Sequence, residues 1–118
     1  MAVGEKIPMV FFPRFTTITG SDALETTPID MLGFGQAQMT FWRGEITGTA
    51  TQASFQVQQS ADLTIWEDLG TAVVITTKGA TDKGNIGPTQ RYIRCTVMLD
   101  TNSTCTIWAV GYGERTEG

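Results

Sequence analysis

The sequence has no histidine among its 118 residues and only two cysteines. Without histidine, neither a Ser-His-Asp nor a Cys-His catalytic arrangement is available, and a His-based zinc site is excluded. Cys95 and Cys105 stand ten positions apart, a spacing that does not match a zinc ribbon. We therefore expect no catalytic residues, no metal site and no cofactor, and we interpret the chain as not an enzyme.

Clustered positive charge is also missing. The formal net charge is -4, the pI is near 4.6, and no run of Lys or Arg occurs. Because binding to a phosphate backbone needs clustered positive charge, we do not expect nucleic acid as a partner. The apolar segment 7–12 is too short for a signal peptide or a membrane span and is closed by Pro13. We expect no membrane partner and synthesis in a reducing cytoplasm.

Carboxylates offer the remaining routes to catalysis or metal binding. Glu67 and Asp68 are sequence neighbours, so on a strand they point to opposite faces and do not form the acid pair of a glycosidase. The aspartates at the predicted turns show no EF-hand spacing. Turn formation explains these aspartates better than calcium binding does.

Threonine and glycine are abundant, with 20 and 13 residues. Threonine suits a half-exposed strand face, and glycine suits turns and bulges. Apolar and polar residues alternate in short segments between turn signals, which predicts about eight strands, at 9–18, 29–34, 36–46, 53–59, 64–69, 72–77, 90–99 and 104–113. We predict an all-β fold, an antiparallel, jelly-roll-like β-sandwich, as one domain over residues 1–118. Residues 1–14 form either an edge strand or an N-terminal arm on a neighbouring subunit.

The last two predicted strands are expected to form a hairpin. Their inward residues meet in one core only if Leu99 lies opposite Cys105 and Val97 opposite Ile107. In that register the two thiols are roughly 13 Å apart along the ladder. A disulfide needs Cα atoms within about 7 Å, so Cys95 and Cys105 are predicted to be free and buried.

The other face of this predicted hairpin is unusually apolar and carries Arg94 as its only charge. It collects Tyr92, Thr96, Met98, Thr106, Trp108, Val110 and Tyr112. Large apolar patches outside a core usually mark an interface. The candidate contact residues are Phe11, Phe12, Trp42, Trp108 and Tyr112. Trp66 either packs over one end of the sandwich or stacks on a sugar ring.

One pattern resembles a known family. Residues 55–62 end in Ser60-Ala61-Asp62, Trp66 follows, and Arg91-Tyr92-Ile93-Arg94 opens a later strand. This is similar to discoidin-like jelly rolls, in which a strand ending in Ser-x-Asp precedes a tryptophan and an R-Y-[IV]-R strand follows. Small bacteriophage virion proteins look similar too, including capsid decoration (cement) proteins and tail or fibre modules. The chain departs from secreted discoidin domains in its shorter length and in lacking a terminal disulfide pair.

The resemblance implies a non-enzymatic structural protein located in a phage virion and made in the host cytoplasm. We expect a capsid decoration protein that stabilises the shell as a homo-oligomer, a trimer on the capsid surface. Its partners would be other copies of itself and the major capsid protein or another virion protein. The alternative is a carbohydrate-binding module, receptor-binding or associated with a tail or fibre, with Trp66 or Trp108 as the stacking platform.

Overall fold

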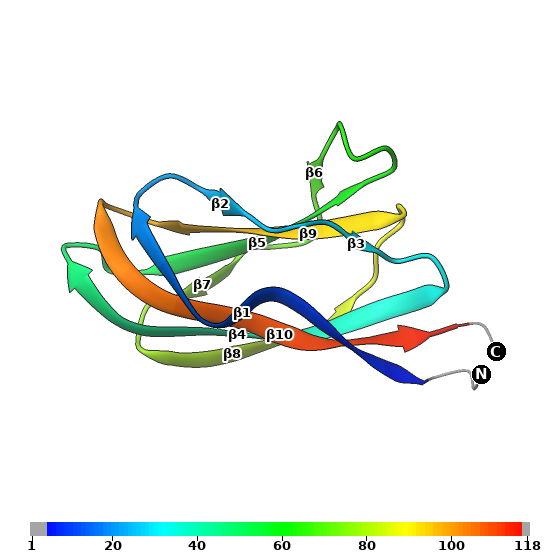
Figure 1. Cartoon of the computed structure of the whole chain (residues 1–118), viewed down its shortest axis with the longest axis horizontal. Coiled ribbons are helices and arrows are strands. Elements are labelled where there is room, and N and C mark those ends of the chain that lie inside the picture. The colour runs from blue at the N-terminus through cyan, green and yellow to red at the C-terminus, as the bar shows by residue number, and fades with distance from the viewer. Residues whose placement is uncertain (1–4, 117–118) are drawn as a thin grey trace.

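A computed structural model describes residues 5–116 and places them in ten β-strands (Figure 1). No helix in that range is long and apolar enough to cross a membrane. The strands are β1 (Lys6–Gly20), β2 (Leu24–Glu25), β3 (Ile29–Asp30), β4 (Phe34–Gly48), β5 (Ala53–Ser60), β6 (Glu67–Asp68), β7 (Val73–Ile75), β8 (Gly79–Ile86), β9 (Tyr92–Leu99) and β10 (Ser103–Arg115).

The strands form two antiparallel sheets that pack face to face (Figure 1). One sheet has the order β1-β10-β4-β8, and we call it sheet A. The other has the order β2-β9-β5-β6, with β3 also on β9 and β7 also on β5, and we call it sheet B. The predicted all-β antiparallel sandwich is confirmed.

The strands pair as in a jelly roll, in which one long hairpin of the chain is rolled into two sheets. Strands from the first half of the chain pair with strands from the second half: β1 with β10, β2 and β3 with β9, β4 with β8, and β5 with β6 and β7. Rolling this long hairpin brings β10 beside β4 and β9 beside β5. The two strands beyond the predicted eight are β2 and β8, whereas β6 and β7 correspond to the predicted strands 64–69 and 72–77.

The predicted hairpin of the last two strands is wrong. β9 belongs to sheet B and pairs with β5, whereas β10 belongs to sheet A and pairs with β1 and β4. The alternation was correct, since Val97 and Leu99 of β9 and Cys105 and Ile107 of β10 are all buried. These residues enter the core from opposite sheets, because the connection at residues 100–102 crosses from one sheet to the other. Both cysteines are free and buried, as predicted.

The predicted strands leave a gap between residues 77 and 90, but residues 79–86 form β8. Its composition lacks apolar alternation because β8 is the edge of sheet A and has a single strand neighbour, β4. Main-chain pairing such as Phe41↔Thr81 and Trp42↔Ala80 defines this strand. Edge strands rich in polar residues are common, because an apolar edge would invite aggregation.

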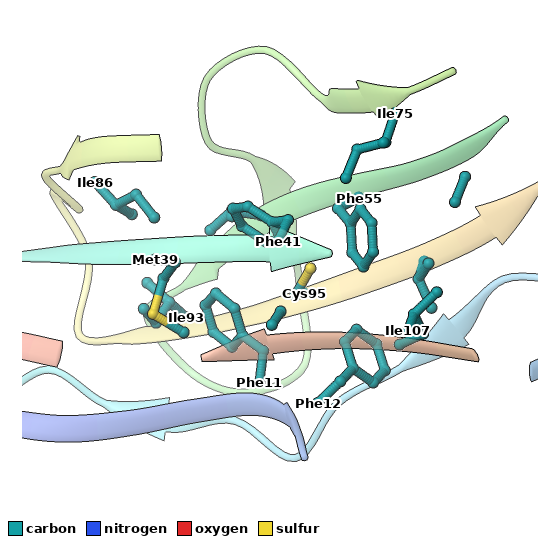
Figure 2. Close-up of a cluster of buried hydrophobic side chains, with 14 of the residues drawn as sticks. Phe11, Phe12, Met39, Phe41, Phe55, Ile75, Ile86, Ile93, Cys95 and Ile107 are labelled. Atoms are coloured by element: carbon teal, nitrogen blue, oxygen red, sulfur yellow. The ribbon is translucent and has the colours of Figure 1, made fainter. Parts of the chain in front are cut away.

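The core lies between the two sheets and is built around aromatic contacts (Figure 2). Phe41 of sheet A and Phe55 of sheet B are both fully buried, and their ring centroids lie 5.1 Å apart. Arg43 is the one charged side chain among the buried residues of 5–116. Its guanidinium donates hydrogen bonds to the carbonyls of Ile75, Gly44 and Thr76 at 2.9–3.1 Å. These bonds satisfy the donors of the buried guanidinium.

Phe11 and Phe12 both point into this core and are 5% and 3% exposed (Figure 2). Neighbouring residues of a regular strand face opposite sides, but a register shift between Val10 and Phe12 breaks the alternation of β1. Phe12 packs edge-on against Phe55, with ring centroids 6.4 Å apart. This placement corrects the expectation that the two rings are contact residues, because the core of the chain itself buries them.

Residues 1–4 of the predicted arm lie outside the described residues. Residues 6–14 form the first part of β1 and pair with β10 of the same chain, beginning at Lys6↔Glu114. The structure thus places this segment in an edge strand of sheet A, where Pro8 and Pro13 are tolerated.

Candidate functional site

The outward side of sheet A carries a row of aromatic side chains. Trp42 of β4 and Trp108 of β10 are direct partners in the antiparallel ladder. Their indoles stack with 5.9 Å between ring centroids and 10° between ring planes. Ile107, Ala109 and Phe41, next to them in sequence, are buried, so the two tryptophans face away from the core. Both remain partly exposed.

A bulge in β1 adds two more side chains to this row. Phe12 pairs with Ala109 and Thr16 with Ile107, so residues 13–15 all lie opposite Trp108. The hydroxyl of Thr16 donates to the carbonyl of Pro13 at 2.7 Å and closes the bulge. The extra residues project Arg14 and Phe15 over the outer face of the sheet.

Arg14 and Phe15 contact the two indoles directly. The Arg14 guanidinium lies 4.3 Å from the centre of the Trp108 ring, a cation–π distance. Phe15 meets Trp42 edge-on, with ring centroids 6.4 Å apart, and is 70% exposed. Its φ of 65° lies in the left-handed region, which is unfavourable for a bulky residue. Strained backbone of this kind concentrates at functional sites, so Phe15 marks this surface as a candidate site.

Tyr112 extends the aromatic surface along β10. Its hydroxyl lies 3.0 Å from Oε1 of Gln38, to which it donates a hydrogen bond, and the Lys6 ammonium lies 5.0 Å from its ring centre. Between Tyr112 and Trp108 the sheet has a shallow hollow of about 360 Å³, whose walls include Arg14 and Asp82. We call the outer side of sheet A, with Phe15, Trp42, Trp108, Val110 and Tyr112, the aromatic face.

Local sequence explains how the Trp42 indole is accommodated on β4. A Cβ at Gly44 would come within 2.9 Å of the Trp42 ring, so only glycine leaves room for the indole to lean over this position. The ring is therefore fixed between Gly44, Phe15 and Trp108. A fixed aromatic ring loses little conformational freedom on binding, which favours a contact role.

Trp66 lies on the opposite side of the molecule, over sheet B. It covers the Arg94 guanidinium at 4.3 Å from its ring centre. Arg94 also donates to Glu25 Oε2 and Gln58 Oε1, both at 2.9 Å. The structure therefore brings Trp42, Trp108 and Tyr112 together and leaves Trp66 apart from them.

The cysteines show no sign of reactivity. Burial raises the pKa of the Cys95 thiol and of the Cys105 thiol above their ordinary value, so both stay protonated. Within residues 5–116, no group of three His, Cys, Asp or Glu side chains is arranged to hold a metal ion.

Sequence reasoning missed Arg14 and Phe15. The available signal was Pro13 within an apolar segment, which predicts an interruption in an edge strand. It does not predict how many residues the bulge inserts or which face they reach.

The strand order and pairing define a jelly-roll β-sandwich. No protein-family model matches the chain, and no curated protein matches its sequence. Solved structures do share the fold. The PBSX exported protein XepA matches with a TM-score of 0.69 and 13% identity over 95% of this chain. The match covers 38% of XepA, so the chain spans well under half of that protein.

Two other structures match over nearly their full lengths. The SPBc2 prophage-derived protein YomS has a TM-score of 0.53 and 14% identity, covering 95% of this chain and 96% of that one. A protein of Bacillus endospore appendages, described as disulfide-linked pili, has a TM-score of 0.51 and 11% identity, covering 99% and 96%. At these identities the likeness shows a common fold.

Proposed function

We propose that the chain is a non-enzymatic structural protein of a phage particle, which acts in the virion as a homo-oligomer. In this role it stabilises the particle by contact, as capsid decoration proteins do, and binds the major capsid protein or another virion protein. The observation that carries the proposal is the aromatic face, where four aromatic rings gather outside the core.

The chemistry of this face supports protein contact. Aromatic residues and arginine are enriched where protein surfaces bury each other, and charged residues are depleted there. Exposed apolar area contributes roughly 25 cal/mol per Å² when a partner removes it from water. A sheet face held by two neighbouring strands also changes shape little on binding.

The same contacts disfavour the alternative of a carbohydrate-binding module. A sugar ring stacks on an open indole face. Trp108 is already contacted by Trp42 and by Arg14, and Trp66 is covered on one side by Arg94. Sugar binding on Trp108 would require one of these groups to move away first, and Trp66 offers a sugar only its other side.

The fold neighbours give independent support. They include a prophage-derived protein and a protein of pili, which are assemblies of many subunits. Each shares only the fold with this chain, so these neighbours are consistent with a particle or appendage component and do not identify one.

The proposal is tested on particles from the organism that encodes the chain. Gradient-purified particles should contain the chain in many copies by quantitative mass spectrometry. Particles from a deletion strain should release their DNA at a lower temperature, and supplying the wild-type chain should reverse the loss. Absence of the chain from purified particles, together with glycan binding that Trp66→Ala abolishes, would instead establish the carbohydrate-binding alternative.

A further inference from the structure

We propose that two copies of this chain pair through their aromatic faces, face to face, about a two-fold axis that runs along the strands of sheet A. The pairing rests on the proposed function, because it assigns an occupant to the same surface. The size of the face, its shape and its charge support this pairing.

The face has the area that a stable dimer needs. Four strands at a spacing of about 4.8 Å and a strand β10 of 13 residues give a surface of roughly 19 by 44 Å, or about 800 Å². Standard protein–protein interfaces bury about 800 Å² on each partner. One face of sheet A is therefore large enough to supply one such interface.

The shape of the aromatic row is complementary to itself. By strand position the row runs from Phe15, on β1, through Trp108 and Trp42 to Ala80, on β8, and the Phe15 ring leans inward from β1 to contact Trp42. It thus projects at one edge and is low at the other, where the exposed residue is an alanine. A two-fold axis along the strands places β1 of one copy over β8 of the other. The β1 position of Phe15 in each copy then lies over Ala80 of its partner.

The same axis brings opposite charges together. Arg14 lies on β1 at the row of Trp108, and Asp82 lies on β8, one outward position beyond Ala80, a distance of roughly 7 Å along the strand. An arginine side chain spans that distance. Lys83 does not oppose the pair, because its ammonium donates to the carbonyl of Thr71 at the edge of the sandwich.

This arrangement differs from the trimer that the family resemblance implies. A two-fold contact uses one surface twice, whereas a trimer needs two different complementary surfaces on each copy. Phe15, Trp42, Trp108 and Tyr112 lie together on one face, which meets the first requirement. The dimer would then present both sheet B faces outward, towards other components of the particle.

Sedimentation of the whole chain from about 1 µM to 1 mM, a range that spans weak to moderate affinities, should show a monomer–dimer equilibrium. Phe15→Gly removes the projecting ring and keeps a residue that accepts the left-handed conformation, so the variant should fold. We expect it to dimerise about tenfold more weakly or worse, as for loss of an interface anchor. The matched control is Ile65→Ser, because Ile65 is 73% exposed on the β5–β6 loop; it should leave the dimer unchanged.

Mixing two charge variants tests the axis itself. Arg14→Asp alone and Asp82→Arg alone should each dimerise more weakly than wild type, because each homodimer then pairs like charges. An equal mixture of the two should dimerise at least about tenfold more tightly than either alone, since a heterodimer restores two opposite-charge pairs. No gain on mixing, or a trimer, would overturn the two-fold pairing. A wild-type chain that is abundant in purified particles and oligomeric there, but not paired through the aromatic face, would overturn the pairing and leave the proposed function standing.

Discussion

The side chains on the two outer faces of the sandwich make different kinds of contact. On sheet B, Arg94 pairs with Glu25 and Gln58, Gln58 donates to Asp68 at 3.1 Å, and Trp66 covers the guanidinium. On sheet A, the corresponding positions hold the stacked indoles and an exposed ring on a strained backbone.

The difference shows that alternation alone does not define a solvent face. Around Arg94 the polar side chains of sheet B satisfy one another, so this part of the face is stable when exposed, whereas Val74 and Met98 elsewhere on sheet B are 46% and 45% exposed. On sheet A, Arg14 and Lys6 lie over ring faces and Gln38 accepts from Tyr112, but Phe15 is 70% exposed, and a partner would remove its apolar area from water. The aromatic face is therefore the better candidate for binding, although both faces that carry tryptophan look alike in the sequence.

The largest effect is expected from the core that both faces share. Phe55 is fully buried and contacts Phe12 and Phe41 across the two sheets. Phe55→Ala should lower the free energy of unfolding by about 3–5 kcal/mol, through lost burial and the cavity left behind. Chemical denaturation measures this change. A loss below about 1 kcal/mol would mean that the sheets are not held together by this contact.

A smaller effect is expected at the polar face. Arg94 is 17% exposed in its side chain and holds Glu25, Gln58 and Trp66 in place. Arg94→Ala should cost about 1–3 kcal/mol of stability, because it leaves hydrogen-bonding partners unsatisfied. It should not change self-association in sedimentation.

Trp108→Ala, on the aromatic face, should weaken self-association. If both changes affected association equally, the distinction between the two faces would be removed.

The sequence predicted which side chains face inward more reliably than which strands are neighbours. Alternation placed Val97 and Ile107 in the core correctly, because burial depends on local two-residue periodicity. The pairing of β9 with β10 failed, because the same inward pattern is satisfied whether two strands share a sheet or face each other across a core. Only the long-range strand pairings of the jelly roll distinguish these two cases.

The candidate site was predicted in part. Trp42, Trp108 and Tyr112 were selected as exposed aromatics, and the structure brings them to one face. Phe11 and Phe12 were selected because they lie in an apolar segment that could form an arm on a neighbouring subunit, but both are buried, because a bulge turns both rings inward. Bulges depend on main-chain pairing with a neighbouring strand, and a single sequence gives little information about that pairing.

Acid should weaken sheet B and its loops first. The Arg91 guanidinium, 2.8 Å from Asp30, lowers the pKa of that carboxyl below 3.8, and hydrogen bonds from Thr51 lower the pKa of Asp100. A carboxyl with a lowered folded-state pKa stabilises the fold above its unfolded value and loses that effect as pH falls through the folded value. Thermal midpoints should therefore fall below about pH 4. Asp30→Asn should reduce that fall, and an unchanged acid profile in this variant would contradict the assignment.

The smallest effect, and the sharpest test of a shared core, concerns the two thiols. Cys95 lies in sheet B and Cys105 in sheet A, and both are almost fully buried with a raised pKa. Reductant should leave the native protein unchanged, and a thiol-specific reagent should label neither cysteine. Across a denaturant series both should become reactive in one transition, because contacts such as Phe41 to Phe55 tie the sheets together. Earlier labelling of Cys105 in a Cys95→Ala variant than of Cys95 in a Cys105→Ala variant would show that sheet A opens by itself. In that case the aromatic face would be less rigid than its packing indicates, and preorganisation would no longer explain binding there.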